Sequence, residues 1–479
     1  MRYLKLKKFT TYLAGLLILS ACASDNLSDP PVVNHKNTPF YLTFELSQPS
    51  DASTRAEEDK EGNEAKLTSL VALLVDTDNV GQPTVIQGIG AAVQADIGEP
   101  KDGKYTVTLN MGVASLYTRQ HKYRLFVFAN LNDYSALLAS HGKRLDDIGS
   151  LTASTEIYSA AQLAAADFKG LPFSTNKFDA SVIQVYLKEN TDYSSSSPYI
   201  VQEDSGKENP ETEGAGVLWI TPLHACMNFV EETGVDDFIY TVGTDAKPEV
   251  KVQIKNATFV NAAKKTFLLP QGEKGNFSLT SPASPGFSNS ISVAINGGKI
   301  FYAPEYIPSV SEEGRLGYDA ASYMELQAIL IVDASCTGTD PDVRKAISEA
   351  NTNAASHPSL FYFDDGTFQS ALTTVSHADE ENWHEVKWND TLGGYAVTYR
   401  HAIRHDAGDG MNLDDGTIHP MEYAVVRNYL YNIGIKSVSS LPHKFNPSDP
   451  VENSRQEISI QISPAKWTGY HRGAIEIDY

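Results

Sequence analysis

FYLTFEL, residues 40–46, is the stretch from which the fold can be inferred. Its apolar side chains alternate with more polar ones, and they are Phe40, Leu42, Phe44 and Leu46. A period of two is typical of a β-strand with one buried face. The flanking segments, 23–39 and 47–66, are polar and should be exposed. We therefore predict an isolated strand between two polar, exposed segments.

Similar apolar or alternating runs recur along the chain, separated by Gly, Pro, Asn and Asp. They predict strands at 67–75, 105–109, 124–129, 181–187, 250–254, 323–332, 423–435 and 457–462. Helical periodicity is limited to 134–148, 160–168 and 341–351. Many strands with few helices are typical of β-sandwich domains, so we expect a mainly β protein with a few short helices. The acidic segment 192–216 is predicted to be a long loop, followed by a domain boundary near residue 230.

The first residues have the pattern of a bacterial lipoprotein signal peptide. Basic residues precede a short apolar core at 13–19, which is too short to span a bilayer because spanning takes about 20 residues. Leu19-Ser20-Ala21-Cys22 matches a lipobox, in which small residues precede the cysteine that accepts diacylglycerol. We expect residues 1–22 to be the signal peptide, with the chain held to a membrane through lipid on Cys22.

The charge of the chain bears on its partners. The formal net charge is −22, which argues against a nucleic-acid partner. Such acidity also makes copies of the chain repel one another, so any assembly needs specific contacts. Two cysteines remain after Cys22, namely Cys226 and Cys336, and they are either small buried side chains or a disulfide.

Candidate catalytic and metal sites are weak in this sequence. It contains no GxSxG, HExxH or Walker A motif, and we predict no enzyme activity and no cofactor. The densest polar cluster is the Asp-rich segment 405–416, near His401 and His405. Its carboxylates could bind calcium, but the spacing does not match an EF-hand, and a solvated turn between strands is the favoured interpretation. We therefore predict no metal site.

Several stretches, taken in order, resemble the fimbrillins of type V pili, especially the major subunits of short fimbriae. They are spread over most of the chain and comprise residues 41–49, 53–56, 123–131, 171–174, 423–431 and Trp467. The resemblance implies two transthyretin-like β-sandwich domains, which we place at 56–230 and 231–479. It also implies a structural subunit of a surface fimbria that supports adhesion or biofilm formation.

The resemblance further implies a route of assembly. Such subunits reach the outer membrane as lipoproteins, and an Arg-specific protease then removes the N-terminal segment. Here Arg55 is the only arginine between Arg2 and Arg119, so cleavage is expected between Arg55 and Ala56, with 23–55 as the propeptide. A C-terminal strand of a neighbouring subunit would fill the vacated groove. The expected donor strand lies within 467–479, where Ile475, Ile477 and Tyr479 share one face.

The expected partners are therefore copies of the chain, other fimbrial subunits, the protease, the outer membrane before cleavage, and a receptor on a host or bacterial cell. Stalk, tip and anchor roles stay open. The alternative is a surface glycan-binding lipoprotein of a nutrient-uptake system. That alternative explains the lipobox, the β-rich sequence and the aromatic residues, but it does not explain an isolated strand before a lone arginine.

Overall fold

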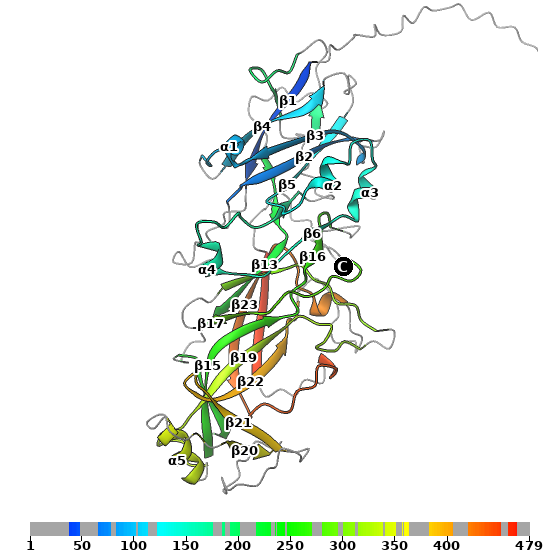
Figure 1. Cartoon of the computed structure of the whole chain (residues 1–479). Coiled ribbons are helices and arrows are strands. Elements are labelled where there is room, and N and C mark those ends of the chain that lie inside the picture. Colours follow the sequence, from blue (N-terminus) through cyan, green and yellow to red (C-terminus); the bar gives the residue numbers. More distant parts are fainter. Residues whose placement is uncertain are drawn as a thin grey trace, which may run out of the picture.

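The computed structural model describes residues 38–47, 66–77, 83–101, 104–113, 122–175, 184–186, 192–201, 217–230, 235, 237–244, 247–270, 280–295, 300–311, 315–338, 341–350, 357, 359–363, 383–405, 420–451 and 458–466. These residues form a mainly β structure with short helices, as the sequence predicts (Figure 1). None of the helices among them is long and apolar enough to cross a membrane.

The strands are β1(Pro39–Ser47), β2(Ser69–Thr77), β3(Pro83–Val93), β4(Lys104–Val113), β5(Lys122–Ala129), β6(Thr152–Ser154), β7(Tyr158–Ser159), β8(Phe173–Ser174), β9(Gln184–Tyr186), β10(Tyr199–Ile200), β11(Val217–Trp219), β12(Thr221–Pro222), β13(His224–Val230), β14(Ile239–Thr244), β15(Lys247–Val260), β16(Lys265–Phe267), β17(Ile291–Ala294), β18(Ile300–Pro304), β19(Tyr323–Ile331), β20(Leu360–Phe363), β21(Trp383–Asn389), β22(Gly394–Ala402), β23(Tyr429–Val438) and β24(Ile458–Lys466). The helices are α1(Gln94–Ile97), α2(Ser135–Leu138), α3(Leu145–Gly149), α4(Ala160–Leu163), α5(Pro341–Ala350) and the 3₁₀ helix η3(Pro420–Tyr423).

The N-terminal half of the described chain is a β-sandwich. One sheet has the order β10-β1-β11, with β4 also paired to β1, and the other has the order β12-β8-β5-β2-β3, with β9 paired to β5. Alternate side chains of β1 and β4 pack against those of β2 and β5 in one buried apolar cluster. The opposite face of β2 and β5 carries a second apolar row, which packs against Leu137 of α2 and against Leu145 of α3. Both faces of this sheet are therefore covered.

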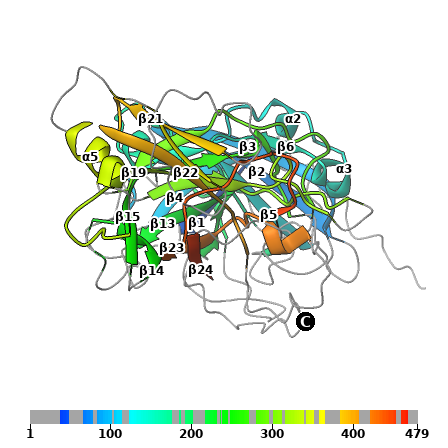
Figure 2. The same cartoon turned by 90° about the horizontal axis from the view of Figure 1, so that it is seen from below.

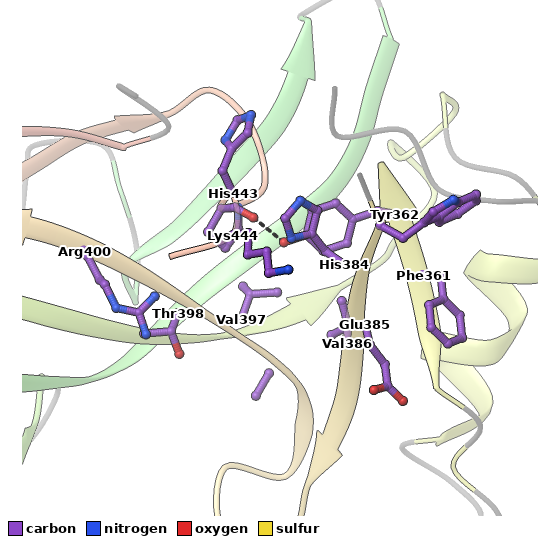
Figure 3. A pocket seen from close by; sticks show the side chains of 13 residues that line it. Phe361, Tyr362, His384, Glu385, Val386, Val397, Thr398, Arg400, His443 and Lys444 are labelled. Atoms are coloured by element: carbon purple, nitrogen blue, oxygen red, sulfur yellow. Dashed lines mark hydrogen bonds between the residues drawn. The ribbon is translucent and has the colours of Figure 1, made fainter. Parts of the chain in front are cut away.

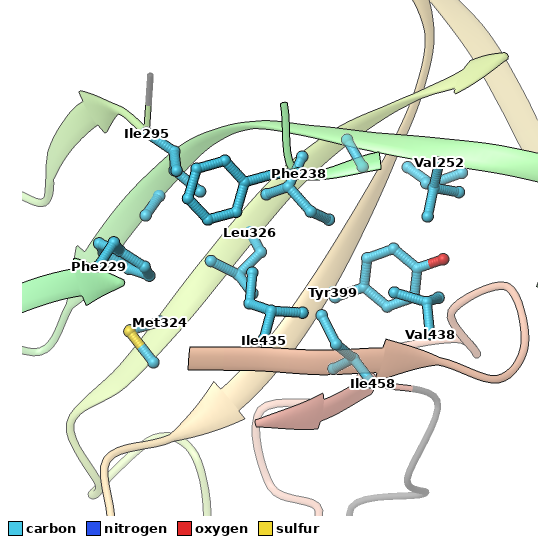
Figure 4. Packing of buried hydrophobic residues seen from close by; sticks show 14 of the residues in the cluster. Phe229, Phe238, Val252, Ile295, Met324, Leu326, Tyr399, Ile435, Val438 and Ile458 are labelled. Atoms are coloured by element: carbon cyan, nitrogen blue, oxygen red, sulfur yellow. The ribbon is translucent and has the colours of Figure 1, made fainter. Parts of the chain in front are cut away.

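The C-terminal half is a second sandwich, between the sheet β24-β23-β13-β18-β7 and the sheet β14-β15-β19-β22-β21-β20. Its core is the largest apolar cluster of the described residues (Figure 4). Met324, Leu326 and Tyr399 approach it from one sheet, and Phe229 and Ile435 approach it from the other. In the end-on view, α5 and α3 lie on opposite sides of the molecule (Figure 2).

The two cores share a sheet. In β13, Ala225 and Met227 belong to the C-terminal core, whereas Cys226 between them belongs to the N-terminal core together with its paired neighbours Tyr302 and Leu430. Two further pairings join early and late parts of the chain, namely β6 with β16 and β7 with β18. Thus β13 pairs with C-terminal strands, although it precedes the predicted domain boundary at residue 230.

Three sequence predictions are wrong in detail. The helix predicted at 134–148 is two helices, because Gly142 has a φ of 76° and separates α2 from α3. The helix predicted at 160–168 stops at residue 163. The strand predicted at 423–435 begins only at Tyr429, because Asn428 adopts a φ of 61° that no strand tolerates.

Two open questions from the sequence are answered. Cys226 and Cys336 are both free and buried, so they are small core side chains and not a disulfide. The segment predicted as a loop at 192–216 contains β10, which pairs with β1, and it continues into residues that are not among those described.

Candidate functional site

The candidate site is β1 and the slot that holds it. β1 pairs along its length with β4 in antiparallel register, from Pro39 opposite Val113 to Ser47 opposite Lys104. Its other edge pairs in parallel with two short strands, β10 at Leu42–Thr43 and β11 at 45–47. Tyr41 N donates to Tyr193 O at 2.9 Å, and Val201 N donates to Thr43 O at 2.8 Å. β1 is therefore an interior strand, although it is separated in sequence from every strand that it contacts.

One face of β1 is apolar and buried. The side chains of Phe40, Leu42, Phe44 and Leu46 are exposed by at most 1% and lie in the N-terminal core. Because β1 alternates with a period of two, these four side chains all point into the sandwich. The sequence predicted this burial correctly. Phe40 also contacts Tyr193 edge to face, with ring centroids 5.5 Å apart.

The opposite face of β1 is polar. Thr43 Oγ1 and Thr108 Oγ1 lie 2.7 Å apart, and Lys104 Nζ lies 3.5 Å from Glu45 Oε2. Both residues of that ion pair are partly exposed, so the pair contributes at most about 1 kcal/mol. The buried face therefore supplies most of the attachment of β1 to the body.

Removal of β1 would leave a long apolar slot between β4 and the β10–β11 edge. Each buried side chain of this size contributes about 1.5–3 kcal/mol, so four of them are worth on the order of 6–12 kcal/mol. Unpaired ladder groups would also face one another across the slot, on β4 and on the β10–β11 side. An open sheet with an apolar row and free backbone groups is a binding site for an extended strand.

Several predicted site residues lie beyond the part of the chain that the structure describes. They are Cys22, Arg55, Ala56, Ile475, Ile477 and Tyr479. The roles assigned to them stay predictions. The structure does describe β24, which precedes the expected donor segment, and it lies at the end of its sheet, paired only with β23 in the strand order.

The motif at 123–131 contains a buried asparagine, Asn130, whose side chain joins three segments of the N-terminal sandwich. Asn130, with a φ of 54°, accepts through Oδ1 from Thr68 N at 2.8 Å. Its Nδ2 donates to Lys66 O at 2.7 Å and to Leu171 O at 2.8 Å. These bonds join the start of β2 to the second motif, 171–174. Gly170 is required there, since a Cβ would lie 2.1 Å from Lys66 O.

The motif at 423–431 contributes Arg427 to a buried ion pair at the joint between the sandwiches. Arg427 Nη2 donates to Glu305 Oε2 at 2.6 Å and to Phe267 O at 2.5 Å, and both charged side chains are almost fully buried. Asn428 N donates to His224 O at 2.8 Å. His224 Nε2 lies 2.8 Å from Glu156 O. Burial lowers the pKa of His224 to about 4, the bond to Glu156 opposes this, and the charge of Arg427 adds to it.

The carboxylates of the Asp-rich segment lie outside the described residues, which include only the two histidines beside it, His401 and His405. His405 Nδ1 lies 2.8 Å from the hydroxyl of Tyr431, and burial lowers the pKa of His405 to about 4. His401 Nδ1 bonds to Ala402 O at 2.8 Å. Among the described residues, no group of three His, Cys, Asp or Glu could hold a metal ion, and 406–419 lie outside them.

The sequence did not predict β10 and β11, the two strands that form one side of the slot. β10 and β11 are too short to show a periodic pattern, and β10 sits in a segment whose acidity suggested a loop. The buried Arg427 and Glu305 were also missed, since charged residues are rarely fully buried and nothing in one sequence marks an exception. The only available indication was that Arg427 lies among apolar residues.

Comparison with known proteins gives one family match. Residues 395–472 match the model "Major fimbrial subunit protein type IV, Fimbrillin, C-terminal", which confirms the resemblance to fimbrillins and supports a structural role in fimbriae at the cell surface. This range includes β22 except its first residue, together with β23, β24 and the buried Arg427. No curated protein matches the chain.

Solved structures show weak likenesses over most of the chain. The tip fimbrial protein Mfa3 from Porphyromonas gingivalis is 12% identical, with a TM-score of 0.41, covering 90% of this chain and 100% of that chain. A Parabacteroides distasonis protein described as a cell adhesion protein is 12% identical, with a TM-score of 0.45, covering 90% and 100%. A fimbrial assembly protein from Parabacteroides distasonis is 10% identical, with a TM-score of 0.37, covering 88% and 99%.

Proposed function

We propose that this chain, whose C-terminal region matches the fimbrillins, is a polymerising subunit of a surface fimbria that exchanges β1 for a strand of a neighbouring subunit. The position of β1 carries the proposal. It is an interior strand with four buried side chains, yet its covalent connection to the strands around it runs through residues 48–65, which contain Arg55. One cut in that connection separates a core strand from the fold.

The proposed route begins with export as a lipoprotein anchored through Cys22. An Arg-specific protease then cuts between Arg55 and Ala56, and β1 leaves with the propeptide 23–55. The vacated slot takes the C-terminal strand of the next copy, and repetition builds the fibre. The mature chain would consist of the two β-sandwich domains placed at 56–230 and 231–479. The partners are copies of the chain, other fimbrial subunits and the protease, and the fibre supports adhesion or biofilm formation.

Changing the cleavage site tests the first step. Arg55→Lys keeps the positive charge but removes the side chain that an Arg-specific protease requires, so we expect full-length lipidated monomers and at least a tenfold loss of surface polymer. Mass spectrometry of protein sheared from cells would measure the N-terminus, which should be Ala56 in the wild-type chain. As a matched control, Glu58→Gln in the same segment should leave cleavage and polymer unchanged. Normal fibres from the Arg55→Lys chain would contradict the role of Arg55.

The donor strand has its own test. Ile475→Asp combined with Ile477→Asp places charges on the face that should enter the slot, and burying an unpaired carboxylate is strongly unfavourable. We expect normal cleavage at Arg55 but no growth beyond monomers, measured as the loss of high-mass bands in unheated gels. Glu476→Gln, on the opposite face, should polymerise normally. If the Asp variant assembles, another segment is the donor.

The alternative function, a glycan-binding lipoprotein of a nutrient-uptake system, makes the opposite prediction for the native protein. It requires a lipidated N-terminus at Cys22 and monomers only. The fimbrillin match over 395–472 favours the fimbrial role.

A further inference from the structure

A second feature lies at the end of the molecule away from β1, where β21 separates from β22 (Figure 1). The two strands pair only next to their turn, from Lys387 opposite Ala396 to Asn389 opposite Gly394. Beyond that point, residues 383–386 of β21 pair with β20, while residues 396–402 of β22 pair with β19. The strands form a fork, and a cavity of about 420 Å³ opens between them.

The cavity is lined by basic and imidazole side chains. Arg400 comes from β22, His384 comes from β21, and His443 and Lys444 come from the segment after β23. Figure 3 shows Lys444 between His384 on one side and Thr398 and Arg400 on the other. His384 and His443 have ring centroids 6.4 Å apart. These four basic or imidazole side chains line one cavity of a chain whose net charge is −22.

Contacts behind the cavity fix its walls. Arg400 Nε donates to Glu325 Oε1 at 2.8 Å, and its guanidinium lies over the Phe445 ring at 3.9 Å. The Tyr362 hydroxyl donates to Pro442 O, and the Tyr362 ring stacks on His384 at 4.9 Å. Arg400 and His384 are therefore held in position before any ligand binds, which reduces the entropy cost of binding.

The carboxylate in the cavity lining is already engaged elsewhere. Glu385 is turned away from Lys444 (Figure 3), and its Oε1 accepts from Ser359 Oγ at 2.6 Å while its Oε2 lies 2.9 Å from Lys387 Nζ. These two partners, Ser359 first, lower the pKa of Glu385. Among the described residues Lys444 makes no ion pair, so its ammonium group is available to an anion from outside.

The size and the remaining lining restrict the ligand further. A volume of about 420 Å³ falls in the range of small-molecule sites. Val386, Val397 and Pro442 offer small apolar surfaces, and Thr398 offers a hydroxyl. A sugar ring presents both C–H faces and hydroxyl groups, and a carboxylate on it would pair with Lys444 and with the terminal nitrogens of Arg400.

We propose that the cleft between β21 and β22 binds an acidic saccharide, a sugar that carries a carboxylate. The cleft goes beyond the structural role in the fibre, since it is built within one chain and lies away from β1. Loss of strand exchange would leave saccharide binding intact, and loss of saccharide binding would leave the fibre intact.

The test is calorimetric titration of the full chain with 3′-sialyllactose and, separately, with neutral lactose. A hydrogen-bonded charge pair is worth about 1.5–3 kcal/mol, so we expect sialyllactose to bind at least about tenfold more tightly than lactose. Lys444→Gln should weaken sialyllactose binding by about tenfold while leaving the melting temperature unchanged. The Lys444 side chain is exposed, so the change should not prevent folding.

Lys387→Gln is the matched control. It removes the same charge from the same fork, but on the face where Lys387 pairs with Glu385, so sialyllactose affinity should stay as in the wild-type chain. Equal binding of lactose and sialyllactose, no binding of either, or equal weakening by Lys387→Gln and Lys444→Gln would each overturn the proposal.

Discussion

Phe44→Ala lowers the free energy of unfolding of the uncleaved precursor by about 3–5 kcal/mol and leaves the assembled fibre unchanged. The first effect follows from burial, because Phe44 is fully buried in the N-terminal core and its truncation leaves a cavity. The second follows from the proposed exchange, since β1 is no longer part of a cleaved subunit. Denaturant unfolding of the Arg55→Lys precursor, with and without Phe44→Ala, measures the first effect. Thermal dissociation of wild-type and Phe44→Ala fibres measures the second.

Glu45→Ala is the matched control for Phe44→Ala. Glu45 is the next residue of β1, but its side chain lies on the polar face, where it contributes only a partly exposed ion pair to Lys104. The precursor should lose at most about 1 kcal/mol. A fibre that is destabilised by Phe44→Ala as much as the precursor would show that β1 remains in the assembled subunit.

Glu305→Gln lowers the free energy of unfolding by about 3–5 kcal/mol, in the precursor and in the mature chain alike. The substitution keeps the shape of the side chain but leaves the guanidinium of Arg427 buried without a counter-charge. Urea unfolding monitored by tyrosine and tryptophan fluorescence would measure the loss. Replacing both partners, as Glu305→Leu with Arg427→Met, should cost less than Glu305→Gln alone, because no charge then remains in the interior.

Glu325→Gln provides the comparison within the same chain. Glu325 pairs with Arg400 at 2.8 Å, close to the 2.6 Å of the buried pair, but the side chains of Glu325 and Arg400 are each about a quarter exposed. Water stabilises the remaining charge there, so the loss should be below about 1 kcal/mol. Equal losses from Glu305→Gln and Glu325→Gln would mean that burial does not decide the strength of the Arg427 pair.

The sequence predicts the fold class and β1 well because both depend on local periodicity. Phe40, Leu42, Phe44 and Leu46 alternate strictly, and all four are buried. It predicts less where a single backbone angle decides the outcome. Asn428 reads as part of an apolar run, but its positive φ stops any strand there, and only the structure shows that His224 O holds its backbone in place.

The candidate site is predictable only in part for a similar reason. The sequence predicts β1, the strand proposed to be removed. The slot is formed by β4, β10 and β11, which come from three distant parts of the chain. The fork between β21 and β22 is also invisible in the sequence. Its lining joins residues 361–362, 383–386, 396–398, 400 and 442–444, and nothing local indicates that these segments meet.

The sheet shared by the two cores has a mechanical consequence. β23 runs roughly along the long axis of the molecule, and β13 pairs with it in parallel over five residue pairs (Figure 1). Tension applied between the two ends would load these hydrogen bonds in shear, so that all must break together instead of one after another. The row Leu430–Cys226–Tyr302, buried in the opposite core, would have to be pulled out at the same moment. The joint between the sandwiches is thus a stiff link under stretching and not a hinge.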